Sequence, residues 1–151
     1  MKYYVHYGDA HYDPSKFRMI RNGAGMAHNK PWGGLWGSPV NSRYGWKQFV
    51  EDEGIVPLSK LKEENSFTFA LRDGAKVLTI RRGEDCIFPM VEMMSLLDGE
   101  RYMAVDFVKL STEYDAVEVE IEDVYNRMSG WDCDSIVILN PAVVVETRKE
   151  V

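Results

Sequence analysis

The chain has 151 residues, 45% of them hydrophobic and 28% charged, which fits one ordinary globular domain over residues 1–151. This composition excludes a disordered chain, and no apolar run reaches the roughly 18 residues of a membrane span. The N-terminus lacks the charged start and apolar block of a signal peptide, so we expect a cytoplasmic protein with no membrane partner. Two cysteines, Cys86 and Cys133, are too few for a disulfide framework, and we expect reduced thiols.

The charge is distributed unevenly along the chain. The total of −6 argues against a general nucleic-acid-binding protein, because phosphate contacts need a basic surface. Residues 1–50 carry seven Lys or Arg against two Asp, a net charge of +5, whereas the remainder carries 11 basic and 22 acidic residues, a net charge of −11. The acid-free window between Asp13 and Glu51 is also rich in aromatic residues. Such a window can hold a ligand with phosphates and rings, although a solvated basic face with buried tryptophans has the same composition.

The first half of the chain predicts a strand, a long loop and a helix. Residues 2–7 are aromatic and β-branched, as is typical of a strand. The stretch 22–39 holds five of the twelve glycines and is predicted to be a loop with a short strand at 34–38. Apolar residues at helical spacing predict a helix over 43–53, which Gly54 ends.

The middle of the chain predicts a hairpin followed by two helices. Residues 66–71 and 76–80 alternate apolar and polar side chains around Asp73-Gly74, which is a strong signal for a β-hairpin. Apolar density favours a helix over 85–97, with Pro89 in its first turn. A second short helix is predicted over 106–114.

The last third of the chain predicts three strands. Residues 116–121 alternate apolar residues with Glu118, Glu120 and Glu122, and we expect these acids to be solvated or to pair with the basic first half. Residues 136–139 and 143–145 predict a buried strand and a final strand, with the turn at Asn140-Pro141 between them. Short strands mixed with short helices indicate an α+β fold with a mainly antiparallel sheet.

The sequence contains none of the short catalytic motifs that define P-loop, Rossmann or serine-hydrolase enzymes. Three separate elements remain, and each also has an ordinary structural explanation. His6-Tyr7-Gly8 ends the first strand, where an imidazole and free backbone groups can reach a ligand. The glycine-flanked Trp36 of residues 30–39 offers a ring face, and Ser38 a small donor. Residues 130–135 place carboxylates just before a buried strand, where they can orient a hydroxyl or stabilise positive charge.

In this order, the three elements resemble the ADP-ribosyltransferase superfamily, the group of poly(ADP-ribose) polymerases and diphtheria-toxin-like enzymes. The resemblance implies a split β-sheet with short flanking helices and NAD as the substrate. It implies that His6 holds the nicotinamide ribose, that the backbone of Gly8 clamps the carboxamide, and that Trp36 stacks on the nicotinamide. Ser38 then matches the family's serine, and Asp134 the acid that aids formation of the oxocarbenium-like state.

The candidate site therefore has catalytic residues His6, Trp36 and Asp134 and further NAD-contacting residues. The residues predicted to contact NAD are Tyr7, Gly8, Lys30, Trp36, Ser38, Tyr44 and Asp132. The glutamate usual in the family is absent, so Asp132, Ser135 and Glu120 are alternatives to Asp134.

Three other interpretations stay open. The first is a non-catalytic module that binds a nucleotide or a protein on the same fold. The second is a metal site built from four residues of one segment, His6, Asp9, His11 and Asp13. The third is a nucleophilic cysteine, which the charges of Asp132 and Asp134 on either side of Cys133 disfavour by raising its pKa. For a transferase, the acceptor can be a protein, a nucleic acid, a small molecule or water.

Overall fold

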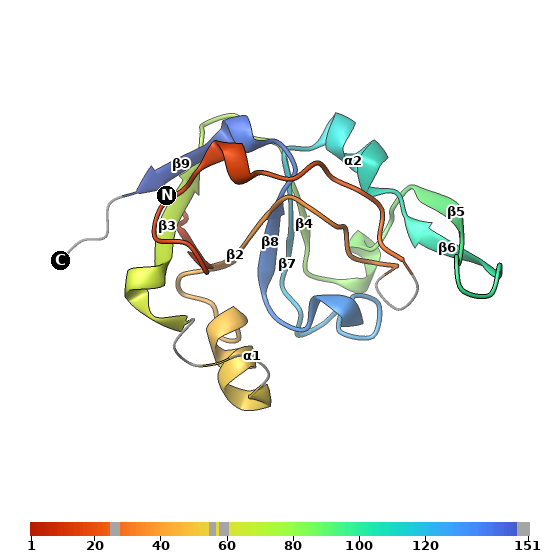
Figure 1. The fold of residues 1–151 in the computed structure, drawn as a ribbon, viewed down its shortest axis with the longest axis horizontal. Coiled ribbons are helices and arrows are strands. Elements are labelled where there is room, and N and C mark those ends of the chain that lie inside the picture. The colour runs from red at the N-terminus through yellow and green to blue at the C-terminus, as the bar shows by residue number, and fades with distance from the viewer. Residues whose placement is uncertain (25–27, 55–56, 58–60, 148–151) are drawn as a thin grey trace.

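The fold is α+β and mostly sheet, with two α-helices in the described part of the chain (Figure 1). The structure is a computed structural model that describes residues 1–24, 28–54, 57 and 61–147. Its strands are β1 (Tyr4–Tyr7), β2 (Leu35–Pro39), β3 (Ser66–Leu71), β4 (Val77–Ile80), β5 (Met90–Met94), β6 (Arg101–Val105), β7 (Ala116–Val119), β8 (Ser135–Ile138) and β9 (Val144–Thr147). The helices are α1 (Trp46–Glu53) and α2 (Phe107–Glu113).

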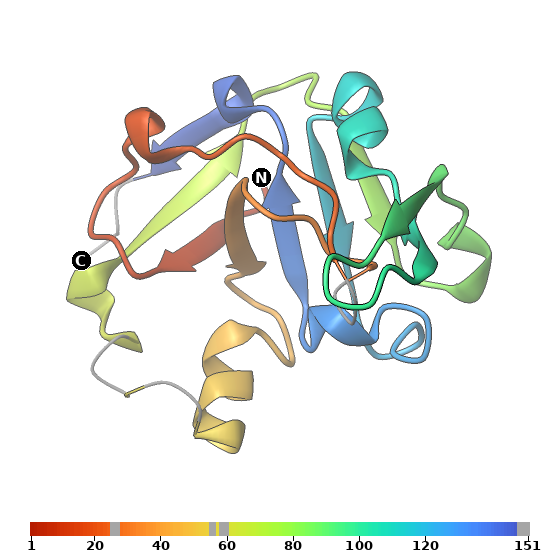
Figure 2. The same ribbon diagram turned by 45° about the vertical axis from the view of Figure 1, so that its right-hand side comes forward.

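Within the described residues, seven of these strands form one sheet in the order β4-β7-β8-β2-β1-β3-β9, and β5 and β6 form a separate two-stranded sheet. The pairings in the large sheet are antiparallel except that of β4 with β7, which is parallel. The mainly antiparallel α+β architecture expected from the sequence is thus confirmed. Strands β1, β2 and β8, which are distant in sequence, are neighbours at the centre of the sheet (Figure 2).

Both faces of the large sheet are covered by apolar side chains. Successive residues of a strand point to opposite faces, and those of β7 and β8 alternate between two clusters. One cluster contains Val117 and Val137 with Phe107 and Trp131, and the other contains Phe69 among its fully buried members. Burial of each large apolar side chain contributes about 1.5–3 kcal/mol, so the two clusters hold the sheet from both sides.

Burial on both faces changes the environment of Glu118, which is 2% exposed. The expectation that this acid is solvated is wrong, because β7 is covered on the face where Glu118 lies. The Glu118 carboxylate accepts a hydrogen bond from the Tyr4 hydroxyl and pairs with Lys2 Nζ at 2.5 Å. The alternative expectation, pairing with the basic first half of the chain, therefore holds for this residue. Burial raises the pKa of Tyr4 far above its ordinary value, and the hydrogen bond to Glu118 adds to the shift.

The predicted β-hairpin of residues 66–80 is wrong in its pairing. The turn itself exists, with Gly74 at a φ of 83° and a hydrogen bond of 3.2 Å from Ala75 N to Arg72 O. The strands on its two sides nevertheless separate: β3 pairs with β1 and β9, whereas β4 pairs with β7 at the far edge of the sheet. The backbone groups through which β3 and β4 would pair in a hairpin are instead bonded to β1, β9 and β7.

The predicted helix over residues 85–97 is also wrong. Residues 90–94 form β5, which pairs with β6 in a hairpin that projects from the body of the protein (Figures 1 and 2). Exposure along β5 alternates from residue to residue, which is the period of a strand and not of a helix. Pro89 lies directly before this strand, where its missing N–H breaks no pairing.

The two helices agree with the sequence more closely. Helix α1 begins at Trp46, three residues later than expected, because Gly45 is its N-cap and Gln48 Oε1 accepts a hydrogen bond from Gly45 N at 3.1 Å. Gly54 ends α1 at a φ of 64°, as predicted. Helix α2 confirms the second predicted helix, and Asp106 caps it. In the described residues, neither helix has the length and apolar character needed to cross a membrane.

Candidate functional site

The candidate site forms where strands β1 and β2 separate. Strand β1 pairs with β2 at two positions, the last joining Val5 to Ser38, whereas its pairing with β3 continues over four positions to the end of β1. His6 and Tyr7 therefore lie beyond the part of β1 that is joined to β2. His6 Nδ1 lies 2.6 Å from the main-chain oxygen of Trp36, so the imidazole bridges the two strands after their ladder has ended.

A cavity of about 280 Å³ opens at this split, and we call it the cavity. The residues that line it are Val5, His6, Tyr7, Lys30, Trp36, Gly37, Ser38, Trp46, Trp131 and Ser135. Five of them belong to the candidate site predicted from the sequence: His6, Tyr7, Lys30, Trp36 and Ser38. The volume is close to the lower end of the roughly 300–1,000 Å³ typical of small-molecule sites, which is room for a ring and its sugar but not for a whole dinucleotide.

His6 is held at both ring nitrogens. Besides the contact of Nδ1 with Trp36 O, its Nε2 lies 3.1 Å from Asp9 Oδ2. A carbonyl and a carboxylate oxygen both only accept, so both contacts are hydrogen bonds at once when both ring nitrogens carry a proton. Asp9 also accepts a hydrogen bond from Lys16 Nζ at 3.0 Å, and this bond is the main reason why the pKa of Asp9 is lowered.

Trp36 is fixed by its indole nitrogen and by a second tryptophan. Trp36 Nε1 donates to Gly33 O at 3.1 Å, and Gly33 adopts a φ of 82° that favours glycine. The ring of Trp131 packs against Trp36 with a centroid distance of 4.9 Å. The Lys30 ammonium lies over the Trp36 ring, 4.9 Å from its centroid. The indole is therefore supported from the core and covered by a cation.

The hydroxyl of Ser38 joins three segments of the site. It donates to the main-chain oxygen of Asp134 at 2.8 Å and accepts from the main-chain nitrogen of Trp46 at 2.9 Å. These bonds connect β2 to the start of β8 and to the start of α1. Ser38 is 3% exposed, so its first role is to hold the wall of the cavity.

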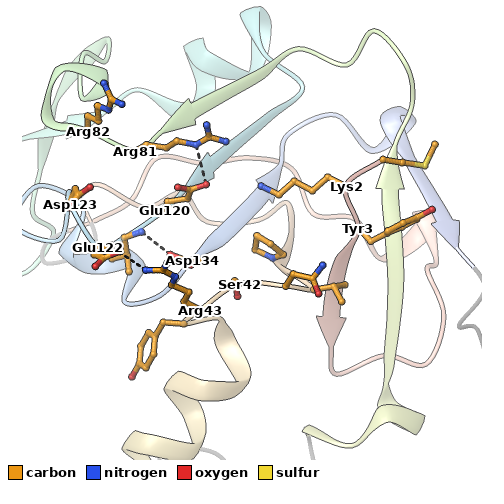
Figure 3. A pocket seen from close by; sticks show the side chains of 16 residues that line it. Lys2, Tyr3, Ser42, Arg43, Arg81, Arg82, Glu120, Glu122, Asp123 and Asp134 are labelled. Carbon is orange, nitrogen blue, oxygen red and sulfur yellow. Dashed lines mark hydrogen bonds and ion pairs between the residues drawn. The ribbon is translucent and has the colours of Figure 1, made fainter.

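A second, larger depression has a volume of about 1150 Å³, and we call it the groove. Figure 3 shows the side chains that line it. It is lined by residues 1–3, 39–44, 81–82 and 120–123 and by Asp134. Its charged groups face one another: Arg81 Nε lies 3.1 Å from Glu120 Oε1, and Arg43 lies 4.0 Å from Glu122. Two pairs of opposite charge therefore lie within the groove.

Asp134 lines the groove and is not among the residues that line the cavity. Its Oδ1 accepts a hydrogen bond from Ile121 N at 2.9 Å. Burial raises the pKa of Asp134, and the hydrogen bond from Ile121 opposes that rise. Only the backbone of Asp134 reaches toward the cavity, through its bond with Ser38.

Three other predicted residues also lie outside the cavity lining. Gly8 has a φ of 117°, and its N–H donates to Asn65 O at 2.7 Å, so this N–H is already used. Tyr44 lines the groove and donates its hydroxyl to Asp52 at 3.0 Å. Asp132 lines neither depression and has a φ of 61°, an uncommon conformation for a residue other than glycine.

Sequence reasoning had not placed Trp46 and Trp131 in the site, although both line the cavity. Trp131 is 2% exposed, and a tryptophan of this kind is read from sequence as a core residue. Trp46 is the first residue of α1, and its proximity to Ser38 follows from a helix-to-strand hydrogen bond that no local pattern reveals. The acid-free aromatic window was the one signal that included Trp46.

The alternative metal and cysteine sites receive no support from the geometry. His11 pairs with Glu146 at 3.0 Å, and Asp13 caps a short turn of helix, so neither joins His6 and Asp9. No cluster of three or more His, Cys, Asp or Glu suited to a metal occurs in the described ranges. Burial raises the pKa of the Cys133 thiol, and the neighbouring aspartates add to the shift, as their sequence positions predicted.

Comparison of the chain with protein-family models, with curated proteins and with solved structures found no match in any of the three.

Proposed function

We propose that the cavity binds the nicotinamide end of NAD and that the protein is an ADP-ribosyltransferase-like NAD-binding protein, which transfers ADP-ribose to an acceptor or hydrolyses NAD. The observation that carries this proposal is the convergence of His6, Trp36 and Ser38 on one cavity. They lie on the neighbouring strands β1 and β2, and β2 also pairs with β8. The resemblance to the superfamily implies that His6, Trp36 and Ser38 share one site.

The residues of the cavity fit a ligand that combines a flat ring, a sugar and phosphates. The Trp36 ring offers a stacking surface, and His6 Nε2 can donate to a ribose hydroxyl in place of Asp9. The Lys30 ammonium can pair with phosphate oxygens. In the transfer itself, the bond from ribose C1′ to nicotinamide breaks with its electrons going to the ring, and C1′ bonds to an acceptor group that loses a proton.

A second function, binding without transfer, is favoured by the position of the acid. Among the residues that the structure describes, no Asp or Glu lines the cavity, and Asp134 lines the groove. A carboxylate beside the developing positive charge lowers the barrier to transfer, so its absence slows that step more than it weakens binding. For the transferase, a protein, a nucleic acid, a small molecule or water can serve as the acceptor. The unpaired Cys86 and Cys133 support a cytoplasmic location.

The first test is thermal stabilisation by NAD. A ligand at one hundred times its Kd stabilises the folded state by about 2.7 kcal/mol, so millimolar NAD should raise the melting temperature by several degrees. His6→Ala should abolish the rise. His6→Gln serves as a second variant, because its amide can still donate to Trp36 O and keep the strands joined. Arg81→Ala, in the groove, should respond as the unchanged protein does.

The proposal would be contradicted if millimolar NAD did not raise the melting temperature of the unchanged protein. It would also be contradicted if NAD raised the melting temperature of His6→Ala and His6→Gln as much as that of the unchanged protein. If NAD binds in the groove, Arg81→Ala loses the response instead. Release of free nicotinamide during incubation separates the two functions. A transferase or hydrolase releases nicotinamide, whereas a binding module is stabilised by NAD and releases none.

A further inference from the structure

Three tryptophans and a tyrosine line the cavity, and a lysine ammonium already lies over one of their rings. Trp36, Trp46, Trp131 and Tyr7 supply the aromatic surface. Lys30 Nζ is 4.9 Å from the Trp36 centroid, within the roughly 6 Å over which a cation is attracted to an aromatic face. Tryptophan is the most effective aromatic partner for a cation, and the attraction grows when the pair is shielded from water.

In the described part of the chain, no acidic side chain lines the cavity to hold the Lys30 ammonium as an ion pair. Trp36 is partly buried, and Trp131 beneath it is 2% exposed, so a charge over this indole has lost part of its contact with water. The face of Trp36 then supplies the negative potential that offsets the Lys30 charge inside the cavity. Several aromatic side chains around one site, called an aromatic cage, are used by proteins to recognise organic cations such as quaternary ammonium groups.

We propose that the cavity is an aromatic cage for a positively charged ring, and that Lys30 occupies the place of the ligand's charge until the ligand displaces it. The proposal rests on the proposed function, because the nicotinamide ring of NAD is such a cation. The flexible four-carbon stem of Lys30 allows its ammonium to leave the ring face. Once displaced, the ammonium lies close enough to pair with the phosphates of the same ligand.

Lys30 then has opposite effects on two parts of one ligand. For a cationic ring without phosphates, its ammonium competes for the Trp36 face and weakens binding. For whole NAD, the Lys30 ammonium gives up its contact with the Trp36 ring and pairs with the phosphates, so Lys30 strengthens binding. A neutral ring gains little from the cage in either case, because the attraction depends on the charge.

The experiment is a set of calorimetric titrations with 1-methylnicotinamide, nicotinamide and NAD. The first is a cationic ring without phosphates and the second is its neutral counterpart. Lys30→Met keeps the length of the side chain and removes its charge. Lys47→Met is the matched control, because Lys47 lies on the outer side of α1 in an exposed pair with Glu51.

We expect Lys30→Met to bind 1-methylnicotinamide at least threefold more tightly than the unchanged protein does, and NAD at least threefold more weakly. Its affinity for nicotinamide should change by less than twofold, and Lys47→Met should match the unchanged protein with all three ligands. In the Lys30→Met background, Trp36→Ala should abolish binding of 1-methylnicotinamide. Trp36→Phe should retain part of it, and serves where the alanine variant does not fold.

The cage is overturned if Lys30→Met leaves the affinity for 1-methylnicotinamide unchanged or lowers it, or if no variant binds this probe. The outcomes also separate the cage from the proposed function. Binding of 1-methylnicotinamide that strengthens in Lys30→Met, without any effect of NAD on stability, supports the cage and contradicts NAD as the ligand. If NAD binds but Lys30→Met leaves the affinity for 1-methylnicotinamide unchanged, the result contradicts the cage and not the proposed function.

Discussion

The cavity and the groove both border the large sheet, but the side chains that line them differ in type. The cavity is small and aromatic, and its deepest member, Trp131, belongs to the apolar core. The groove is about four times larger, and four of its charged residues form the pairs Arg81–Glu120 and Arg43–Glu122. Lys2, which also lines the groove, pairs with the buried Glu118. Ser38 and Asp134 form the boundary between the two depressions.

The difference shows that the larger depression is not the better candidate for a ligand site. A paired set of exposed charges offers an incoming ligand little, because each new contact must replace an existing one. In the cavity, the described lining residues include no acid to pair with the Lys30 charge, so a ligand can gain contacts there. The two regions should therefore respond differently to substitution, in stability and in pH dependence.

The largest effect is expected for Trp131→Ala. The side chain is 2% exposed, packs against Trp36 and Phe107, and donates from Nε1 to Asn29 O at 2.7 Å. Truncation of such a tryptophan costs about 3–5 kcal/mol in free energy of unfolding, which urea denaturation measures. Tyr125→Ala, at a 57% exposed position, is the control and should cost less than about 0.5 kcal/mol. A cost for Trp131→Ala below about 1 kcal/mol would show that the cavity is not part of the core.

A smaller effect is expected at the edge of the groove for Lys2→Met. This change leaves the Glu118 carboxylate buried without its cation. Removal of one partner of a fully buried pair costs about 3–5 kcal/mol, and we expect about 1–3 kcal/mol because the Lys2 side chain is 45% exposed. Adding Glu118→Gln should restore part of the loss. Arg43→Met, which breaks the exposed pair with Glu122, should change stability by less than about 0.5 kcal/mol, and an equal loss there would contradict the distinction.

The smallest expected effects are those of pH on stability. They have opposite signs for Asp9, which contacts His6, and for Asp134, which lines the groove. The pKa of Asp9 is lowered, so its carboxylate stabilises the fold above pH 3.8, and this stability is lost as the pH falls through the lowered value. The pKa of Asp134 is raised by burial, so its ionisation destabilises the fold as the pH rises from 3.8 through the raised value.

At pH 7 we therefore expect Asp9→Asn to be less stable than the unchanged protein, by under about 1 kcal/mol because Asp9 is 38% exposed. Asp134→Asn should be as stable or more stable, since its Oδ1 can still accept from Ile121. Both differences should shrink as the pH falls below 3.8, in urea titrations between pH 3 and 7. A stability difference of the same sign for both variants would contradict the assignment.

The fold was predictable where local chemistry decides it and not where distant partners do. The turn at Gly74 was recognised, but the strands beside it take partners from β1, β9 and β7, which no local pattern names. For Glu118, the alternative of solvation was wrong because an alternating strand suggests one solvent-exposed face, whereas this sheet is covered on both. The other alternative, pairing with the basic first half, holds through Lys2. In β5, apolar density was given more weight than the alternation that also marks residues 90–94 as a strand.

The candidate site was predictable in its rings and cations and less so in its acid. His6, Trp36 and Lys30 stand out by residue type, and all three line the cavity. Trp131 is hidden from such reasoning, because its burial makes it resemble any core residue. The side of the sheet that the Asp134 carboxylate occupies depends on its bond with Ile121, a contact between two loops that the sequence does not encode locally.

Strand β8 lies between β2 and β7, although it comes from residues 135–138 near the end of the chain. A nascent polypeptide on the ribosome therefore holds β1, β2 and β3 on one side and β4 and β7 on the other without the strand that joins them. The sheet closes only after residues 135–138 have been translated. Until then two unpaired strand edges are exposed, and early termination of translation would leave an aggregation-prone fragment.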